Sequence, residues 1–272
     1  MALVTITMGL GSGDIGIAQQ VADRLNVKLY DDHGLKEAAL HMGIRSWDLG
    51  SLDEKAPGFF DQILSRRPEL YRDFMEAVVF EVAQNGKGII IGHGSQILLR
   101  DFGCALHVHL HAPEPARIEN LTRQCVLSRD AAEKLIHKKD NEQRGFFRYA
   151  FNMRMSDPSL YDLIINTEKL GTDLTVDLIV ESARSDEIKT CSLEAVDTME
   201  RMSQTRKIRA ALIDNGITVS MLHIEVPRKN AAAVRGFTHT QEEIDRIEEI
   251  VGALSGASEL NTDISVMPSS GD

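Results

Sequence analysis

A glycine-rich loop between a short apolar strand and an amphipathic helix constrains this chain more than any other feature. Residues 4–8 form a β-branched run that predicts a buried strand. Four glycines follow within residues 9–16, and apolar residues then recur at helical spacing as far as Leu25. In such a strand–loop–helix, the loop N–H groups and the positive end of the helix converge on an anion. The stretch therefore predicts a phosphate-binding loop.

The loop departs at two positions from the usual phosphate-loop pattern, G-x-x-x-x-G-K-[ST]. When Gly11, Ser12 and Gly13 are aligned with the usual Gly-Ser-Gly, Asp14 stands where the pattern has lysine. Gly16 then stands where the pattern has serine or threonine. The donor-phosphate cation and a hydroxyl ligand for Mg²⁺ are missing, and Asp14 would repel a triphosphate unless Mg²⁺ lay between them.

Charge and cysteine content limit the remaining possibilities. The 272 residues carry a net charge of −11, which disfavours binding to nucleic acid or to anionic membranes. The N-terminus shows no secretory signal, and no apolar run approaches the roughly 20 residues that a membrane span needs. Cys104, Cys125 and Cys191 form no C-x-x-C pair, so we expect unpaired thiols in a reducing compartment. The expected location is the cytoplasm.

Strand-like runs alternate with helical patterns through the first two thirds of the chain. Strands are expected near residues 4, 27, 88, 105 and 162. This alternation is typical of a three-layer, doubly wound parallel sheet, in which ligands bind outside the carboxyl ends of the strands. Asp31, Asp32, His93, Asn166 and Thr167 follow such strands. Residues 44–68 lack a clear pattern, and we leave open a mobile insertion over a site and an ordinary surface connection.

Three histidines alternate along one expected strand, at positions 107, 109 and 111. Their imidazoles would share one face, which raises the possibility of a metal site. No cysteine or carboxylate is placed near them, so we favour one polar face at a sheet edge.

The segment 113–154 is basic within an acidic chain. Nine basic residues stand against six acidic ones, a local net charge of +3. Such a directed field suits an anionic substrate, although solvated helix faces would have the same composition. The basic residues are Arg117, Arg123, Arg129, Lys134, Lys138, Lys139, Arg144, Arg148 and Arg154.

The hydrophobic period changes after residues 186–196, which predicts a separate α+β module. Thr240 with Glu243 three residues on forms a capping box at the start of one of its helices. Residues 187–272 carry a net charge of −5, which argues against nucleic-acid binding. The expected elements are a helix over 199–215, a strand over 217–226, its hairpin partner over 231–237, the capped helix and a strand over 260–266.

Several motifs in one order resemble the cytidylate-kinase-like proteins, a branch of the P-loop nucleoside monophosphate kinases. The resemblance covers residues 4 to about 184, and the 161–167 motif is the most specific part of it. Residues 197 to about 267 more weakly resemble a BON module. The expected domains are therefore 1–186, cytidylate-kinase-like, and 197–268, BON-like. The kinase-like motifs are Gly11-Ser12-Gly13, Leu29-Tyr30-Asp31, Ile89 to Gly94, Val108 to Pro113 with Arg117, Lys139-Asp140 with Arg144, and Tyr161 to Thr167.

The resemblance assigns roles to particular residues and implies ATP and Mg²⁺. Arg117, Arg144 and Arg148 would belong to a mobile lid that clamps the transferring phosphoryl group, because guanidinium groups match phosphate oxygens. Asp31 would face the acceptor nucleotide, and His93 stands where an arginine is usual. Asp140 is placed with the substrate-binding residues. The donor phosphates would lie on a degenerate loop formed by Gly9, Gly11, Ser12, Gly13, Asp14, Ile15 and Gly16.

Two functions remain open. One is phosphoryl transfer from ATP to a nucleoside monophosphate of the cytidylate type or to a small metabolite. The alternative is a catalytically inactive protein that senses a nucleotide or phosphate and reports through its C-terminal module. Either implies a nucleotide or small phosphorylated ligand, with no nucleic acid and no transmembrane segment. A homodimer stays open.

Overall fold

The computed structural model describes residues 3–42, 68–188, 190–255 and 259–267. The chain forms two compact units, and each is assembled from two separate stretches. The first unit contains residues 1–34 and 85–195, and the second contains residues 35–84 and 196–272. The unclear 44–68 segment lies outside the described residues, apart from its last residue.

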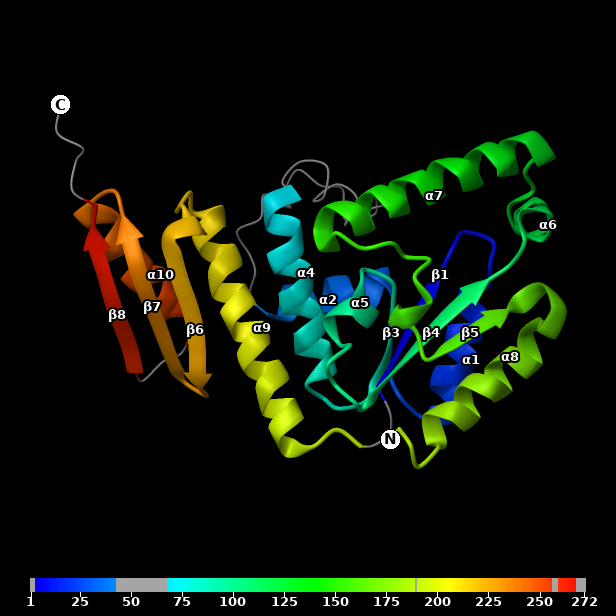
Figure 1. Ribbon diagram of the computed structural model, residues 1–272, viewed down its shortest axis with the longest axis horizontal. Coiled ribbons are helices and arrows are strands. Elements are labelled where there is room, and N and C mark those ends of the chain that lie inside the picture. The colour runs from blue at the N-terminus through cyan, green and yellow to red at the C-terminus, as the bar shows by residue number, and fades with distance from the viewer. Residues whose placement is uncertain (1–2, 43–67, 189, 256–258, 268–272) are drawn as a thin grey trace. The chain divides into compact units, whose positions relative to one another are not determined.

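The first unit is built on a five-stranded parallel sheet in the order β2-β3-β1-β4-β5 (Figure 1). The expected doubly wound parallel sheet is therefore confirmed. The direction of winding reverses between β1 and β4, so the carboxyl ends of these strands form the switch point at which such sheets bind ligands. The strands are β1 (Leu3–Met8), β2 (Leu29–Tyr30), β3 (Gly88–Ile91), β4 (Ala105–His111) and β5 (Leu163–Asn166).

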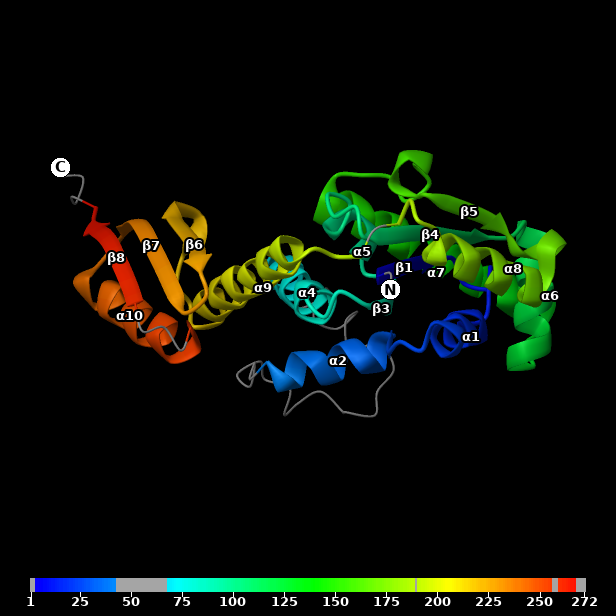
Figure 2. The ribbon, with the colours of Figure 1, turned by 90° about the horizontal axis from the view of Figure 1, so that it is seen from below.

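Helices cover both faces of this sheet. Two of them lie side by side on one face, α1 (Ile15–Leu25) and α8 (Thr167–Arg184), while α7 (Arg129–Phe151) crosses the other face (Figures 1 and 2). Alternate strand residues pack against α1 and α8 to form the main core. Two shorter helices lie wholly in this unit, α5 (Ser95–Leu98) and α6 (Glu114–Cys125). Two further helices begin in this unit and continue into the second, α2 (Asp32–His41) and α9 (Leu193–Asp214).

Local details differ from the expectations in three places. The strand with the three histidines is not at a sheet edge, because β4 lies between β1 and β5. The last strand covers only Leu163–Asn166 of the expected 159–167, since Pro158–Leu160 forms a 3-10 turn ahead of it. Helix α8 begins directly at Thr167, earlier than the apolar pattern over residues 174–183 predicts, with a non-helical residue at Gly171 inside it. Both helix and strand patterns were present in the sequence, but their boundaries depend on how the chain turns at proline and glycine.

One sequence-based expectation about cysteine is wrong. Cys104 and Cys191 form a disulfide that links the start of β4 to the segment before α9, and Cys125 is a free, exposed thiol. The two partners are 87 residues apart in sequence. Their spacing carries no signal of pairing, because the fold alone brings them together. The cysteine pattern therefore no longer argues for a reducing compartment.

The second unit combines a small sheet with helices from both of its stretches. In the sheet, β7 pairs antiparallel with β6 and parallel with β8. The predicted hairpin is confirmed, and Glu243 N–H donates to Thr240 Oγ1 at 3.2 Å as the predicted cap requires. The Glu243 carboxylate accepts from the N–H of His239. The elements are α4 (Pro68–Ala83), η3 (Val219–Met221), β6 (Leu222–Arg228), β7 (Ala231–Thr238), α10 (Gln241–Ser255) and β8 (Glu259–Val266).

Helix α4 belongs to this unit and contacts α9 through a cluster of polar side chains. Asp73 and Glu76 on α4 are both buried. Arg206 on α9 pairs with both carboxylates, and Arg209 donates to Asp73 at 2.8 Å. Ser203 donates to the carbonyl of Ala77 at 2.9 Å.

The expected domain limits, 1–186 and 197–268, stay a prediction, because the compact units follow a different grouping of the chain. A separate small C-terminal sheet exists, but its resemblance to a BON module is not confirmed. Within the described part of the chain, no helix is both long enough and apolar enough to cross a membrane.

Candidate functional site

The glycine loop connects β1 to α1 in a conformation that needs glycine at one position. Ser12 N–H donates to the carbonyl of Gly9 at 2.9 Å, which closes the turn. Gly11 has a φ of +79°, and a Cβ there would lie 2.7 Å from the carbonyl oxygen of Arg117. Any side chain at Gly11 would therefore combine an unfavourable backbone conformation with a backbone clash.

Side chains from two helices hold the loop by its carbonyl oxygens. The carbonyl of Leu10 accepts from Arg117 Nε at 2.8 Å, and that of Gly11 accepts from Asn120 at 3.0 Å. The carbonyl of Ser12 accepts from the hydroxyl of Thr167 at the start of α8. Three consecutive carbonyl dipoles are thus satisfied within the protein, which lowers their repulsion toward an anion near the loop.

The N–H groups at the end of the loop form the complementary surface. Within the described residues, the N–H groups of Gly13, Asp14 and Ile15 have no hydrogen-bond partner. They stand at the N-terminus of α1, whose 11 residues carry no acidic side chain in the first turn. The Asp14 carboxylate caps this helix by accepting from the N–H of Gly16 at 3.1 Å. Unpaired N–H groups at a helix N-terminus are the arrangement that binds phosphate.

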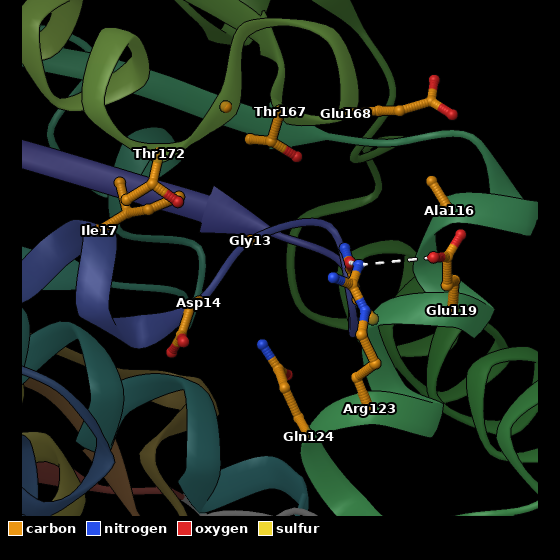
Figure 3. A pocket seen from close by; sticks show the side chains of 12 residues that line it. Gly13, Asp14, Ile17, Ala116, Glu119, Arg123, Gln124, Thr167, Glu168 and Thr172 are labelled. Atoms are coloured by element: carbon orange, nitrogen blue, oxygen red, sulfur yellow. Dashed lines mark hydrogen bonds and ion pairs between the residues drawn. The ribbon is translucent and has the colours of Figure 1, made fainter.

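A cavity of about 430 Å³ opens beside this end of the loop (Figure 3). Its walls come from the loop, from α1, from one face of α6 and from the first turns of α8. Figure 3 shows Asp14 and Gln124 on one side of the space and Thr167 on the other. The lining residues are Gly13, Asp14, Ile17, Ala116, Glu119, Asn120, Arg123, Gln124, Thr167, Glu168, Gly171 and Thr172.

The charged side chains of the cavity are of mixed sign. Asp14, Glu119 and Glu168 supply carboxylates, and Arg123 supplies a guanidinium. Arg123 donates to the side chain of Asn120 at 3.0 Å and lies 3.8 Å from Glu119. Carboxylate oxygens beside unpaired N–H groups suit a phosphate that arrives together with Mg²⁺. The donor set therefore fits a magnesium–nucleotide complex.

Arg117, a predicted lid residue, supports the loop. Its guanidinium forms two parallel bonds with Asp140, at 2.9 and 2.7 Å, and its side chain is only 11% exposed. Its Nε holds the carbonyl of Leu10. Two predicted site residues, Arg117 and Asp140, thus meet beneath the glycine loop, while their catalytic and substrate-binding roles stay predictions.

The other two predicted lid arginines lie on the exposed surface of α7. Arg144 donates to the carbonyl of Asp140 at 3.2 Å and to Asn141 at 2.7 Å, both within its own helix. Arg148 is also exposed, one turn further along. The structure does not bring these two guanidinium groups together with Arg117 in one cluster of bonds.

The predicted acceptor residues lie at the carboxyl ends of β2 and β3. Asp31 accepts from the N–H of Gly34 at 2.9 Å, so its carboxylate stabilises the first turn of α2. His93 Nε2 lies 2.8 Å from the Asp32 carboxylate. The hydrogen bond from His93 lowers the pKa of Asp32, and the positive charge of Lys139 lowers it further. Asp32 and His93 form a joined pair that the sequence did not identify.

The three histidines of β4 do not form a metal site within the described residues. His107 is buried and shares a 2.8 Å hydrogen bond with Thr5, and burial lowers its pKa. The ring of His109 stacks on Tyr161 at 4.8 Å, and burial lowers the pKa of His109 as well. Burial raises the pKa of Tyr161 to about 12. These groups form a neutral, packed polar layer behind the site.

Sequence reasoning missed part of the cavity wall. Ala116, Asn120 and Gln124 lie four and eight positions apart, so they share one face of α6, beside Arg123 of the predicted basic segment. That spacing was available in the sequence. It carried little signal, because a polar helix face is usually solvated.

Comparisons with known proteins found a matching family model and several relatives. Residues 3–169 match the family model described as "Cytidylate kinase-like family". A cytidylate kinase from Sulfurisphaera tokodaii is 27% identical over 174 residues, which cover 63% of this chain and 89% of that protein. A cytidylate kinase from Methanocaldococcus jannaschii is 22% identical over 170 residues, 61% of this chain and 89% of that protein.

A solved structure supports the fold alone. The crystal structure of an uncharacterized protein from Eubacterium ventriosum aligns with a TM-score of 0.53 and 19% identity, and it covers 67% of this chain and 97% of that one. The family match spans the loop, the parallel sheet and most of the cavity wall. On this evidence, the chain belongs to the cytidylate kinase-like family.

Proposed function

We propose that this protein transfers a phosphoryl group from ATP to a nucleoside monophosphate of the cytidylate type or to a small metabolite. The observation that carries the proposal is the glycine loop, whose carbonyl groups are held from behind while its last N–H groups stay unpaired. Phosphoryl transfer depends mainly on positioning and charge neutralisation, which such a loop can provide without a covalent step.

The donor nucleotide would occupy the loop and the adjoining cavity. The unpaired N–H groups and the positive end of α1 would hold its phosphates. The 430 Å³ space between α6 and α8 would take the rest of the molecule. Arg123 is the cation of this cavity and would replace part of the charge of the missing lysine. Mg²⁺ bound to the nucleotide would offset the carboxylates of Asp14 and Glu168.

The acceptor would bind at the carboxyl ends of β2 and β3. Asp31 and the Asp32–His93 pair stand there, and hydroxyl or amino groups of an acceptor could bond to them. The proposed cytidylate-type acceptor follows the names of the relatives. Arg144 and Arg148 are exposed, so a role in clamping the transferred group requires α7 or its side chains to move.

One observation favours the alternative, a protein that binds a nucleotide or phosphate without turning it over. Asp14 stands at the lysine position, and its carboxylate is already bound to the N–H of Gly16 as a helix cap. The loop therefore places a negative charge where kinases of the usual pattern place a positive one.

The deciding experiment measures binding and turnover together. MgATP binding is followed by calorimetry, and ADP formation is assayed against CMP, dCMP, UMP, AMP and hydroxyl-bearing metabolites. Gly11→Ala should weaken MgATP binding at least about tenfold, or 1.4 kcal/mol, because the added Cβ meets backbone. Gly16→Ala is the matched control in the same loop, since its Cβ makes only ordinary contacts, the nearest at 3.6 Å.

The outcomes separate the two functions. Acceptor-dependent ADP formation that Gly11→Ala lowers and Gly16→Ala preserves supports the kinase. MgATP binding that Gly11→Ala weakens and Gly16→Ala preserves, without any ADP formation, supports the sensor. No binding of MgATP or of inorganic phosphate at millimolar concentration would rule out both.

A further inference from the structure

Three side chains that could hold a metal ion converge where α6 meets α7. Glu114 lies in the first turn of α6, and Glu133 and His137 lie on α7. Their carboxylate oxygens and imidazole nitrogen all lie within 4.8 Å of one another. Glu133 and His137 are four residues apart, so they share one face of the helix. His137 Nε2 already lies 3.2 Å from a carboxylate oxygen of Glu114.

The two carboxylates have no lysine or arginine partner among the described residues, although the surrounding segment is basic. Within the described residues, no lysine or arginine forms an ion pair with Glu114 or Glu133. Nearby Lys138 and Lys139 instead pair with Glu142. Two like charges thus converge on one imidazole without compensation, and a divalent cation would remove their repulsion.

The donor set selects the class of cation. One imidazole nitrogen and two carboxylate oxygens are ligands of Zn²⁺ and related transition metals, at about 2.0–2.2 Å. Mg²⁺ and Ca²⁺ prefer oxygen ligands alone. All three side chains are exposed, so they can rotate inward by the small distance that binding requires, and water can complete the coordination.

A cation bound by Glu114, Glu133 and His137 would lie close to the side chains that support the glycine loop. Glu114 lies one turn before Arg117 on α6, and His137 lies one turn before Asp140 on α7. Arg117 and Asp140 are the pair that holds the carbonyl of Leu10 in the glycine loop. A cation shared by the two helices would therefore restrain the elements that support the loop.

We propose that Glu114, Glu133 and His137 form a surface site for one divalent transition-metal cation of the zinc class, which joins α6 to α7. The site is separate from the proposed nucleotide cavity, and its occupancy does not depend on phosphoryl transfer. Glu114, Glu133 and His137 are absent from the cavity lining.

The test uses the full chain without nucleotide, at neutral pH and without chelator. The background carries Cys125→Ser, because an exposed thiol binds zinc by itself. Calorimetry with Zn²⁺ should show one equivalent bound, and thermal unfolding should shift upward with Zn²⁺. Co²⁺ absorption spectra report the ligand set directly. A large excess of Mg²⁺ should not displace the Zn²⁺.

Matched variants decide the assignment. His137→Ala and Glu133→Gln should each weaken Zn²⁺ binding at least about tenfold and abolish the thermal shift, and both sites are exposed, so the fold should persist. His223→Ala is the control, since His223 is an exposed histidine 3.5 Å from Glu225 in the second unit. Equal Zn²⁺ affinity in all three variants would overturn the proposal, as would the absence of binding at about 100 μM Zn²⁺.

Discussion

Asp14 is the clearest departure of this sequence from the usual phosphate-loop pattern, and in the structure its side chain has a stabilising role. Its carboxylate caps α1 by accepting from the N–H of Gly16. A lysine would leave that N–H without its cap, and loss of an N-cap costs about 1 kcal/mol. Aspartate at position 14 thus stabilises the helix while placing a negative charge beside the phosphate site.

Replacing Asp14 by asparagine separates these two effects. Asparagine caps a helix as well as aspartate does, so the free energy of unfolding should stay unchanged. Removing one negative charge beside the phosphate site should strengthen the binding of inorganic phosphate, which brings no Mg²⁺ to offset the carboxylate, by about 1 kcal/mol, roughly fivefold, and less at high salt. Calorimetry at two salt concentrations measures this.

The control is Asp157→Asn, since Asp157 also accepts from a backbone N–H, that of Ser159, away from the loop. Equal affinities of the wild type and Asp14→Asn would show that the carboxylate does not act on the ligand.

Residue-level predictions from the sequence succeeded where the chemistry is local. The glycine loop and the Thr240 cap of α10 could be inferred from neighbouring residues, and Thr240 does accept from Glu243 N–H. The partner of Arg117 could not be inferred in the same way. Asp140 is 23 residues away on another helix, and several acidic residues of that segment were equally available.

At the scale of elements, the pairing of α4 with α9 depends on a buried charge cluster. Asp73 and Glu76 are nearly inaccessible to solvent, and Arg206 binds both. Burial removes these carboxylates from water, so the arginines must replace that hydration. The two helices are therefore joined by an obligatory polar contact.

Truncating Arg206 to alanine should destabilise the protein strongly. Loss of one partner of a buried ion pair costs about 3–5 kcal/mol, and we expect about 2 kcal/mol because Arg206 is partly exposed and Arg209 still holds Asp73. Urea unfolding at pH 7 measures the change. Arg201→Ala on the same helix is the matched control: its partner Asp197 is exposed, so the cost should stay below about 0.5 kcal/mol. Equal costs would show that burial does not set the strength of the cluster.

The order and type of the elements were largely predictable, because hydrophobic period distinguishes strands from helices. The boundaries of the elements were less predictable. Helix α9 begins at Leu193, six residues before the apolar pattern that predicts it. The association of α4 with α9 was not predictable. Its polar side chains resemble an ordinary solvated helix face until the partner helix is known.

At the scale of the whole molecule, the Cys104–Cys191 disulfide closes a covalent loop that contains most of residues 85–195, the second stretch of the first unit. In the chain-entropy account, a closed segment of 87 residues stabilises the fold by about 4–5 kcal/mol at most. Reduction should lower the temperature of unfolding. The double variant Cys104→Ser with Cys191→Ser should unfold at the lower temperature with or without reductant.

Thiol titration checks the pairing itself. The unfolded, unreduced chain should titrate as one thiol, that of Cys125, and the reduced chain as three. Three thiols before reduction would contradict the disulfide. The parallel sheet and its family could be predicted from the sequence, whereas this link and the grouping of residues 35–84 with the C-terminal stretch arise only when distant segments pack.

Each compact unit is made of two stretches that alternate along the chain, and this order has a consequence during synthesis on the ribosome. The first strand emerges early, but its neighbour β3 lies beyond the whole first stretch of the second unit. Helix α4 carries Asp73 and Glu76 out of the ribosome long before Arg206 is translated. At 5–20 residues per second, that interval lasts roughly ten seconds. A nascent chain halted before α9 therefore presents two carboxylates of α4 that the finished fold buries, without the arginines that neutralise them, so the first stretch of the second unit stays incomplete until α9 is made.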